Sequence, residues 1–396
     1  MTGQRMTRRW RAGALAAALA GGLAGCGSAK APAPGASAAA AVPPLTAMSS
    51  VPIAGATWAT VPMGAAAGPD EFWQLFRLPA GGRWTLETPP DIATNGAILL
   101  AGQPGTGSGG TAGTAGTLAA GVRPSLDLTY SPITTTADGG RDWATLPPAS
   151  GLASEADALA AAPGGQLLAL GQDHTADVYT SGSWASLTSE RALAAAPAAR
   201  GCALTGLTAA AYTPAGLPLL AGACGRAGRT GIFRDRGGSW QQAGPALPPT
   251  LAGQTVQVAR LTRIGHQDVA LLEAGGPPDV RLLAAWTSDG QHWTLSPVLR
   301  LGGAAPVSAS FGADGGLAVV LAGGRAVTLA GPGAPWRRLP ALPDGRTVTL
   351  ALPGGGGTDA LAADGGTLTV WRLAATGDSW VRTQTVQVPI QYGSSG

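Results

Sequence analysis

The sequence predicts an all-β fold, a β-propeller of four-stranded blades, with about seven blades expected and six or eight as the alternatives. Three observations predict it: a recurring tryptophan, short β-type runs between turns, and a spare strand near the C-terminus. Tryptophans that follow short Gly- or Asp-containing turns lie 59, 41, 56, 53, 43 and 44 residues apart, at positions 84, 143, 184, 240, 293, 336 and 380. A period of roughly 40 to 55 residues indicates a repeat architecture.

The repeated unit is clearest in residues 305–340. Val307–Phe311 and Leu317–Leu321 have the composition of strands and flank the turn Gly312–Gly316. Ala326–Leu329 and Trp336–Leu339 follow as a third and a fourth strand. Short apolar runs between Gly-rich turns are typical of strands, and four antiparallel strands per unit make a propeller blade.

The same order of strands and turns recurs along the chain, at 91–147 with an insertion, 150–188, 198–245, 255–297 and 346–382. Residues 51–88 supply only about three strands, whereas Thr385–Ile390 is a strand without a unit. Because a propeller must close to remove its sheet edges, we expect Thr385–Ile390 to complete the first blade. A parallel β-helix is the alternative fold, although its coils are shorter than these repeats.

The turns that precede the tryptophans carry a carboxylate and glycines. A carboxylate in a tight hairpin can accept backbone N–H groups, glycine takes positive φ, and the indole can pack between blades. These turns resemble the Asp-box of sialidase-type propellers, and the resemblance implies a structural role, so we expect no catalytic part for them. The residues concerned are Asp138, Gly140 and Trp143, then Asp235 and Trp240, then Asp289 and Trp293.

The first 26 residues have the pattern of an export signal. Four arginines, at positions 5, 8, 9 and 11, precede an apolar run from Ala12 to Ala24 that is too short to span a bilayer. The run ends on Leu23-Ala24-Gly25-Cys26, which resembles the lipobox of bacterial lipoproteins. The resemblance implies that Cys26 carries a lipid and anchors the protein to the outer face of the bacterial cytoplasmic membrane. An ordinary secretory signal is the alternative.

Composition separates the rest of the chain into a tether and a folded domain. Residues 27–50 are rich in Ala, Pro and Ser and read as a flexible tether, and residues 51–396 as the propeller. Without the four signal arginines, 21 of the 25 basic residues remain against 22 acidic ones, a net charge of −1. This balance gives no argument for nucleic acid or for an anionic membrane surface as a partner.

The two cysteines after Cys26 are expected to form a disulfide. Cys202 and Cys224 flank a predicted hairpin whose turn, Thr213–Gly216, lies midway between them. An oxidising compartment favours pairing. Two free thiols or a metal pair are the alternatives.

The resemblance to sialidases extends to one short segment ahead of Trp84. Phe76-Arg77-Leu78-Pro79 resembles the Phe/Tyr-Arg-Ile-Pro segment of that family, which implies a substrate-binding role for Arg77. The stretch from Gln103 to Gly121, where the family's acid/base aspartate should lie, has no carboxylate, and Asp127 is the local substitute beside Tyr130. Phe76-Arg77 is also matched by Phe233-Arg234, so a repeated hairpin explains it, and we expect no glycosidase activity.

Other chemistry finds less support. Gly105 to Gly110 has the spacing of a dinucleotide loop, but no helix follows it to present an N-terminus to a phosphate. His174, His266 and His292 fall in three different repeats, and Asp173-His174 lacks a nucleophile motif. We therefore expect no cofactor and no metal.

The expected function is a non-catalytic binding module, membrane-tethered and monomeric, that holds a protein or a glycan on one face of the propeller. A glycoside hydrolase with rearranged catalytic residues is one alternative. The repeat also resembles propellers of the photosystem II assembly-factor family, which implies a second alternative, an assembly or stability factor for a membrane complex.

Overall fold

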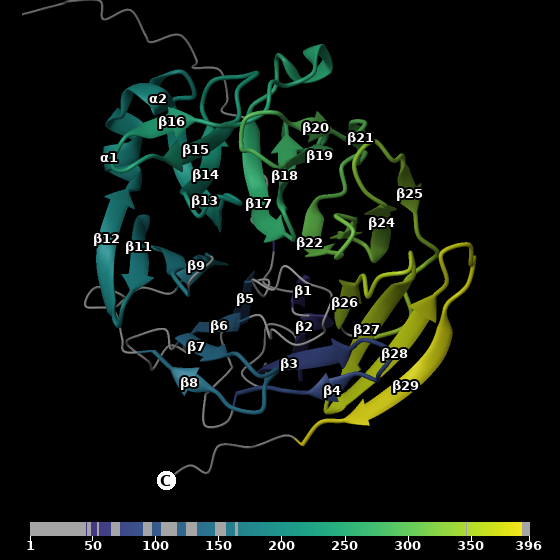
Figure 1. Cartoon of the computed structure of the whole chain (residues 1–396). Helices are drawn as coiled ribbons and strands as arrows, with labels where there is room; N and C mark the ends of the chain where they lie inside the picture. The colour runs from purple at the N-terminus through teal and green to yellow at the C-terminus, as the bar shows by residue number, and fades with distance from the viewer. Residues whose placement is uncertain are drawn as a thin grey trace, which may run out of the picture. The chain divides into compact units, whose positions relative to one another are not determined.

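The computed structural model describes residues 45, 49–53, 55–64, 72–89, 97–103, 117–123, 133–146, 156–162, 165–345 and 347–389. All of them belong to one compact unit, Ala39–Gly396. This unit is a β-propeller, and its sheets are arranged in a ring around a centre (Figure 1).

Three four-stranded antiparallel sheets come from the first half of the chain, and in each the strands pair in sequence order. The first holds β1 (Ser49–Ile53), β2 (Ala56–Met63), β3 (Phe72–Pro79) and β4 (Thr85–Leu86). The second holds β5 (Ala97–Gln103), β6 (Thr117–Arg123), β7 (Ile133–Thr136) and β8 (Ala144–Thr145). The third holds β9 (Ala156–Ala161), β10 (Leu167–Gly171), β11 (Thr175–Thr180) and β12 (Ser183–Ser189).

A nine-stranded sheet follows, made of two groups that a single residue pair joins, Ala223 with Gln257. The first group holds β13 (Leu204–Tyr212), β14 (Pro218–Cys224), β15 (Gly231–Asp235) and β16 (Trp240–Gln242). The second holds β17 (Val256–Ile264), β18 (Gln267–Ala274) and β19 (Arg281–Thr287), with β20 (Thr294–Leu295) and β21 (Leu299–Arg300) both paired to β19.

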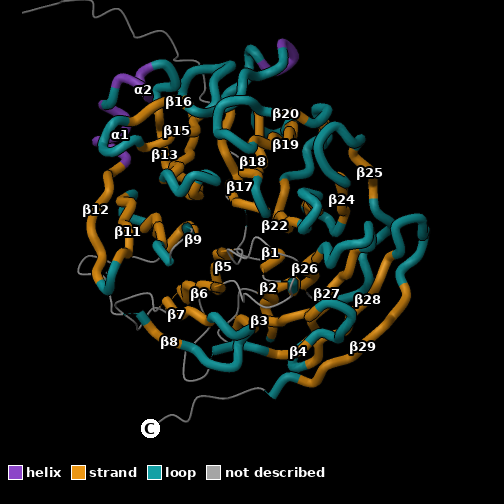
Figure 2. Tube along the Cα trace, in the orientation of Figure 1, coloured by secondary structure: helices purple, strands orange, loops and turns teal. Residues whose placement is uncertain are grey.

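The last two sheets are again four-stranded. One holds β22 (Pro306–Phe311), β23 (Leu317–Leu321), β24 (Arg325–Leu329) and β25 (Trp336–Arg338), and the other holds β26 (Thr347–Ala351), β27 (Thr358–Asp364), β28 (Thr367–Leu373) and β29 (Val381–Gln387). Helical turns are short and lie at one edge of the ring (Figure 2): α1 (Glu190–Ala195), α2 (Pro197–Arg200) and a 3₁₀ turn (Pro249–Leu251).

Apolar packing between successive groups holds the ring together. Alternate residues of each strand face the preceding and the following group, as the pleat of a strand requires. In β18, Ala270 packs with the group before it and Val269 with the group after it. One cluster joins the last group to the first and contains Leu361 and Val370 together with Val61 and Phe76.

The first and last blades contact each other in a different way from the one that the sequence predicted. The expectation that Thr385–Ile390 completes the first blade is wrong, because β29 continues through Gln387 and pairs with β28 in the last sheet. The first blade has four strands of its own, since β1 pairs with β2 around a turn at Gly55. The fold also begins before residue 51: Leu45 is buried and β1 starts at Ser49.

The antiparallel order gives every four-stranded group two ends. Turns between the first and second strands and between the third and fourth lie at one end, which we call the hairpin face. Turns between the second and third strands, and the links between groups, lie at the other, which we call the linker face. No helix among the described residues has both the length and the apolar composition needed to cross a membrane.

Candidate functional site

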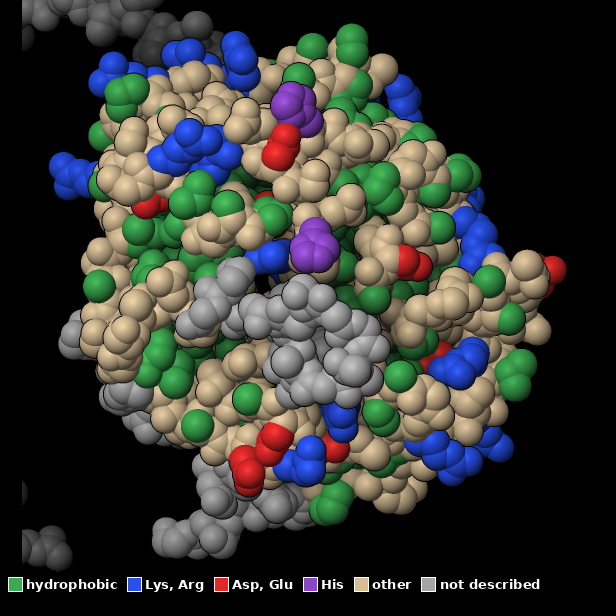
Figure 3. Space-filling model, in the orientation of Figure 1, with side chains coloured by type: hydrophobic (Ala, Val, Ile, Leu, Met, Phe, Trp, Pro, Cys, Tyr) green, Lys and Arg blue, Asp and Glu red, His purple; other side chains and the backbone are tan. Residues whose placement is uncertain are grey.

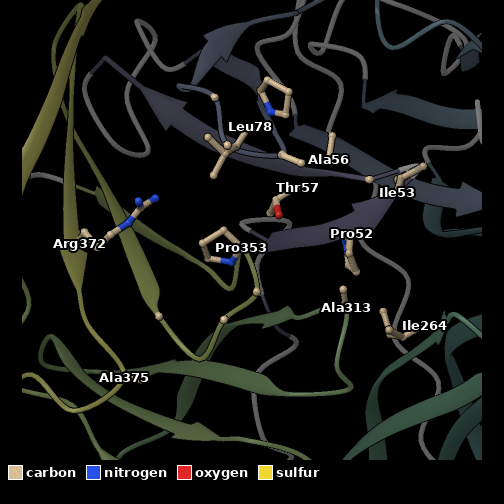
Figure 4. Close-up of a pocket in the computed structure, with 18 of the residues that line it drawn as sticks. Pro52, Ile53, Ala56, Thr57, Leu78, Ile264, Ala313, Pro353, Arg372 and Ala375 are labelled. Carbon is tan, nitrogen blue, oxygen red and sulfur yellow. The ribbon is translucent and has the colours of Figure 1, made fainter. Parts of the chain in front are cut away.

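A cavity of about 770 Å³ opens on the hairpin face, where turns of four groups converge. The first turn of the β1–β4 group contributes Pro52, Ile53 and Gly55–Thr57, and the third contributes Leu78–Gly82. Ile264, Ala313 and the segment 353–357 come from three other groups, and Figure 4 shows several of these side chains around the space.

The lining of this cavity is apolar and rich in backbone. Pro, Gly, Ala, Leu and Ile make up all but two of its lining residues, which are Thr57 and Arg372. Gly354 and Gly355 follow one another at φ 93° and 66°. Since side chains are strained at these angles, this wall of the cavity presents main chain rather than side chains.

Arg372 is held in place by a buried carboxylate. Its Nε and Nη2 donate to Asp359 Oδ1 and Oδ2 at 2.7 and 2.8 Å. Asp359 has no exposed side-chain surface, and its Oδ2 also accepts from Trp84 Nε1 at 2.9 Å. Arg372 therefore lines the cavity with its positive charge already paired to Asp359.

A second cavity of about 320 Å³ lies beside the first and shares Gly354, Gly357 and Ala375 with it. It adds Asp314, whose Oδ1 accepts from Gly316 N at 3.1 Å, and Arg337, whose Nη1 donates to Ala375 O at 2.9 Å. We call the two together the hairpin-face groove. It runs across the β1–β4, β26–β29 and β22–β25 groups.

The centre of the ring is filled where the inner strands meet. Ser50 N of β1 donates to Ser310 Oγ of β22 at 3.0 Å, although their groups are separated by the last group of the chain. A Cβ on Gly102 of β5 would lie 2.2 Å from Ile53 Cγ1, so only glycine fits there. β1 thus contacts β22 and β5, which belong to two other groups.

The predicted turn carboxylates bind their own turns. Asp138 Oδ1 accepts from Arg141 N and Asp142 N at 3.0 and 3.1 Å and from Thr136 Oγ1 at 2.9 Å. The bond from the Asp142 amide, followed by that from Thr136, lowers the pKa of Asp138. Gly139 and Gly140 take φ 81° and 92°.

The Asp289 turn is closed in a similar way, and the carboxylate also contacts the imidazole of His292. Asp289 Oδ1 accepts from Gln291 N and His292 N, both at 2.8 Å, and its Oδ2 lies 2.6 Å from His292 Nδ1. The bond to the His292 ring, before the backbone bonds, lowers the pKa of Asp289, and the same contact raises the pKa of His292. In the third turn Asp235 Oδ1 accepts from Gly238 N at 2.8 Å.

The indoles that follow these turns lie between groups. Trp143 meets the ring of Trp58 edge-on, with centroids 6.4 Å apart. Trp240 packs on the cluster between the third and fourth groups, and Trp293 Nε1 donates to Ala243 O of the preceding group at 2.6 Å. The stabilising role of these turns stays a prediction, which mutants can test.

Phe76-Arg77 and Phe233-Arg234 occupy equivalent places, each in the third strand of its group. The Arg77 guanidinium lies 5.7 Å from the Trp58 ring centroid, and a Cβ on Gly139 of the next group would lie 3.0 Å from its Nη2. Arg234 Nη1 donates to Asp289 O of the next group at 3.3 Å. Both arginines thus contact the turn of the following blade.

The cysteines are joined. A disulfide links Cys202 and Cys224, whose Cα atoms lie 4.9 Å apart. The hairpin turn between them is at Thr213–Gly216, with β13 and β14 on either side. Both cysteines lie at the linker face, away from the groove.

Other candidates from the sequence do not meet at one place. His174 Nδ1 lies 3.2 Å from Glu190 Oε2, whereas His292 contacts Asp289. The described part of the chain contains no group of three His, Cys, Asp or Glu side chains placed to hold a metal. Cys26, Asp127, Tyr130 and the Gly105–Gly110 stretch lie outside the described residues.

Two buried acids were not anticipated from the sequence. Asp268 and Glu273 lie on β18 with 0% and 1% of their surface exposed, and burial raises their pKa values to about 8 and about 7. Within the described structure neither Asp268 oxygen has a hydrogen-bond partner. Their place in an otherwise apolar strand was the only available signal.

Comparison with known proteins finds similarity in structure alone. No family model matches the chain, and no curated protein matches it. Among solved structures the chain is similar to YCF48 bound to a D1 peptide, at 12% identity over 84% of this chain and 94% of that one, with a TM-score of 0.44. It is also similar to YCF48 from Cyanidioschyzon merolae, at 13% identity over 77% of this chain and 94% of that one, with a TM-score of 0.43. A protein from Lactobacillus plantarum is similar at 12% identity over 83% of this chain and 96% of that one, with a TM-score of 0.49.

Proposed function

We propose that this protein is a non-catalytic binding module whose hairpin-face groove holds an extended, largely apolar peptide segment of a protein partner. The observation that carries the proposal is the lining of the larger cavity of the groove: aliphatic side chains and glycine backbone, with Arg372 already paired to Asp359. Apolar clefts with a few placed polar groups are the usual form of ligand sites in proteins. A peptide offers both an apolar surface and main-chain groups to such a wall.

A glycan is the less favoured ligand. Sugar hydroxyls that lose water need hydrogen-bond partners, and burying them without partners costs free energy. The larger cavity offers one hydroxyl, Thr57. The smaller one adds Thr328 and Asp314, which already bond to Leu317 O and Gly316 N, and the described lining residues of both cavities include no aromatic ring. The near-neutral charge of the chain agrees with recognition by shape rather than by charge.

The module is tethered in this proposal. The lipobox-like sequence ending at Cys26 and the Ala/Pro/Ser-rich stretch 27–50 support a lipid anchor on the outer face of the bacterial cytoplasmic membrane. Cys26→Ala should then release the protein from the membrane fraction. Wild-type protein whose intact mass shows no lipid, with the variant still in the membrane fraction, would contradict the anchor but not the groove.

The groove is tested with ligands that the experimenter supplies. A random peptide library is panned against the immobilised full chain, and the affinity of enriched peptides is measured by calorimetry. Ala375→Trp and Ala313→Trp, both exposed in the groove, should each weaken binding at least about tenfold, or about 1.4 kcal/mol. Ala227→Trp, exposed in a turn on the linker face, is the matched control and should bind as the wild type does.

Two outcomes would overturn the proposal. Enriched peptides that bind the groove variants and the wild type equally would place the site elsewhere. Turnover of sialyl-lactose or aryl glycosides that Arg77→Ala abolishes would restore the enzyme.

A further inference from the structure

Three arginines surround a cavity of about 310 Å³ on the linker face. Arg300 ends β21, Arg325 begins β24, and Arg338 ends β25. All three side chains are exposed, and within the described structure none has a hydrogen bond or an ion pair. Asp279 acts on Arg300 through space, and its carboxylate is bound by Arg281.

The rest of this cavity is apolar. Leu299, Leu301, Leu321, Val327 and Leu339 line it together with Gly, Ala and Pro, and none of the described lining residues is acidic. Unpaired guanidinium groups around an apolar floor match a partner that is anionic at its surface and apolar beneath it. Arginine also binds phosphate oxygens by two parallel hydrogen bonds.

The start of the folded chain lies at the same place. Leu45 is buried at 8% exposure in the cluster that contains Leu301, Leu321 and Val327, which are also lining residues of the arginine cavity. β1 runs from Ser49 on the linker face to Ile53 at the hairpin face. Leu45 therefore packs at the interface between the two groups that carry the three arginines, and β1 begins on the face where they lie.

We propose that Arg300, Arg325 and Arg338 dock the linker face onto an anionic phospholipid surface. The inference rests in part on the proposed lipid anchor. An anchor at Cys26 holds the start of the tether at the membrane, and the end of the tether leads into β1 on the linker face. Arginines close to an anionic leaflet strengthen binding by roughly fivefold each. Docking by the linker face turns the hairpin-face groove away from the membrane, toward soluble partners.

The near-neutral composition of the chain concealed this patch. Charges of both signs are scattered among uncharged side chains on the face shown in Figure 3. A whole-chain charge averages over both faces, whereas a membrane interacts only with groups within about one Debye length. The local arrangement decides the interaction.

The first experiment reports which face meets the lipid. A fluorophore is attached to Ala341→Cys, exposed beside the arginines, or to Ala375→Cys, exposed in the groove, in the lipid-anchored full chain. The vesicles contain spin-labelled phosphatidylcholine as a quencher, with or without phosphatidylglycerol. With phosphatidylglycerol we expect quenching at position 341 to be several-fold stronger than at position 375. Without phosphatidylglycerol, or in the variant R300Q/R325Q/R338Q, this difference in quenching should disappear.

The second experiment does not need the anchor. Flotation of the Cys26→Ala full chain with phosphatidylglycerol vesicles should show a partition coefficient roughly 100-fold lower in the triple variant. R83Q/R236Q/R382Q removes the same charge from exposed positions at the hairpin-face ends of their strands and should retain most of the binding.

Equal quenching at 341 and 375, or equal loss of partition in both triple variants, would overturn the proposal. So would arginine-dependent binding of inorganic phosphate together with vesicle binding that ignores the three substitutions, since the site would then serve a small anion. Peptide binding in the groove is measured separately, so its failure and the failure of membrane docking remain distinguishable.

Discussion

The side-chain amide of Gln384 pairs with the backbone of Trp84, 300 residues earlier in the chain. Trp84 N donates to Gln384 Oε1 at 3.0 Å, and Gln384 Nε2 donates to Trp84 O at 2.7 Å. The amide thus supplies both groups that a neighbouring strand would supply, at the seam where the last blade meets the first. Side chains, apolar packing and one backbone bridge, Gly64 with Gly365, close the ring, and no strand is exchanged between the two blades.

Gln384→Ala should therefore weaken the seam. Two hydrogen bonds are lost and the Trp84 backbone groups are left without partners, so the free energy of unfolding should fall by about 1–2 kcal/mol. Gln387→Ala is the matched control: its side chain is exposed on the same strand and accepts one bond from Thr367 within its own blade. Urea titration measures both, and equal effects would mean that the Gln384 contact adds nothing.

Local pattern predicted the blades well and the seam poorly. Leu317–Leu321 is a strand with the predicted bounds, because an apolar run between Gly-rich turns identifies both of its ends. β1 was missed because it has only five residues and contains Pro52, so that it merged with the next run. The pairing of β29 depends on a partner strand, which residue pattern alone does not identify.

The groove could not be read from the sequence for a related reason. Its lining residues come from turns as far apart as Pro52 and Ala375, and none carries a chemical signature. The turn carboxylates could be located, because Asp138 and Asp289 bind groups within four residues of themselves. Sequence analysis thus found what is local and repeated.

Removal of the disulfide should destabilise the fourth group. The bond closes a loop of 22 residues, for which the chain-entropy model gives about 3 kcal/mol. Cys202→Ser with Cys224→Ser should lower the free energy of unfolding by about that amount. Non-reducing peptide mapping checks the bond in the wild type, and two free thiols there would contradict it.

The contact between Asp289 and His292 should make stability depend on pH. The lowered pKa of Asp289 gives stabilisation that is present above about pH 4 and is lost as pH falls through the folded-state pKa. The raised pKa of His292 gives stabilisation that is full below about pH 6.5 and is lost as pH rises through the folded-state pKa.

The difference in melting temperature between wild type and His292→Ala should therefore be largest between about pH 4 and 6.5. Both groups are exposed, so the effect is small and needs a matched control. Asp142→Ala, at the equivalent residue before the tryptophan in the Asp138 turn, is that control. If the difference in melting temperature for His292→Ala does not change with pH, the imidazole stabilises the turn by packing alone and not by its charge.

Asp268 should make the folded state less stable as pH rises. The carboxyl is fully buried beside its cross-strand neighbours Arg263 and Thr287, and within the described residues neither oxygen has a hydrogen-bond partner. Burial raises its pKa to about 8, although the Arg263 charge partly offsets the effect. An acid with a raised folded-state pKa contributes stability that is present below the unfolded pKa, near 4, and is lost as pH rises toward 8.

Asp268→Asn removes this titration while keeping the shape of the side chain. Relative to wild type, the variant should gain about 1.4 kcal/mol of unfolding free energy for each pH unit between about pH 5 and 7, and little below pH 4. Asp378→Asn, in an exposed turn, is the control for loss of a surface carboxylate. Urea titrations at several pH values provide the measurement. Parallel curves for Asp268→Asn and wild type would mean that Asp268 is ionised in the fold, with its charge satisfied by Arg263, because an ionised and paired carboxylate would take up no proton over that range.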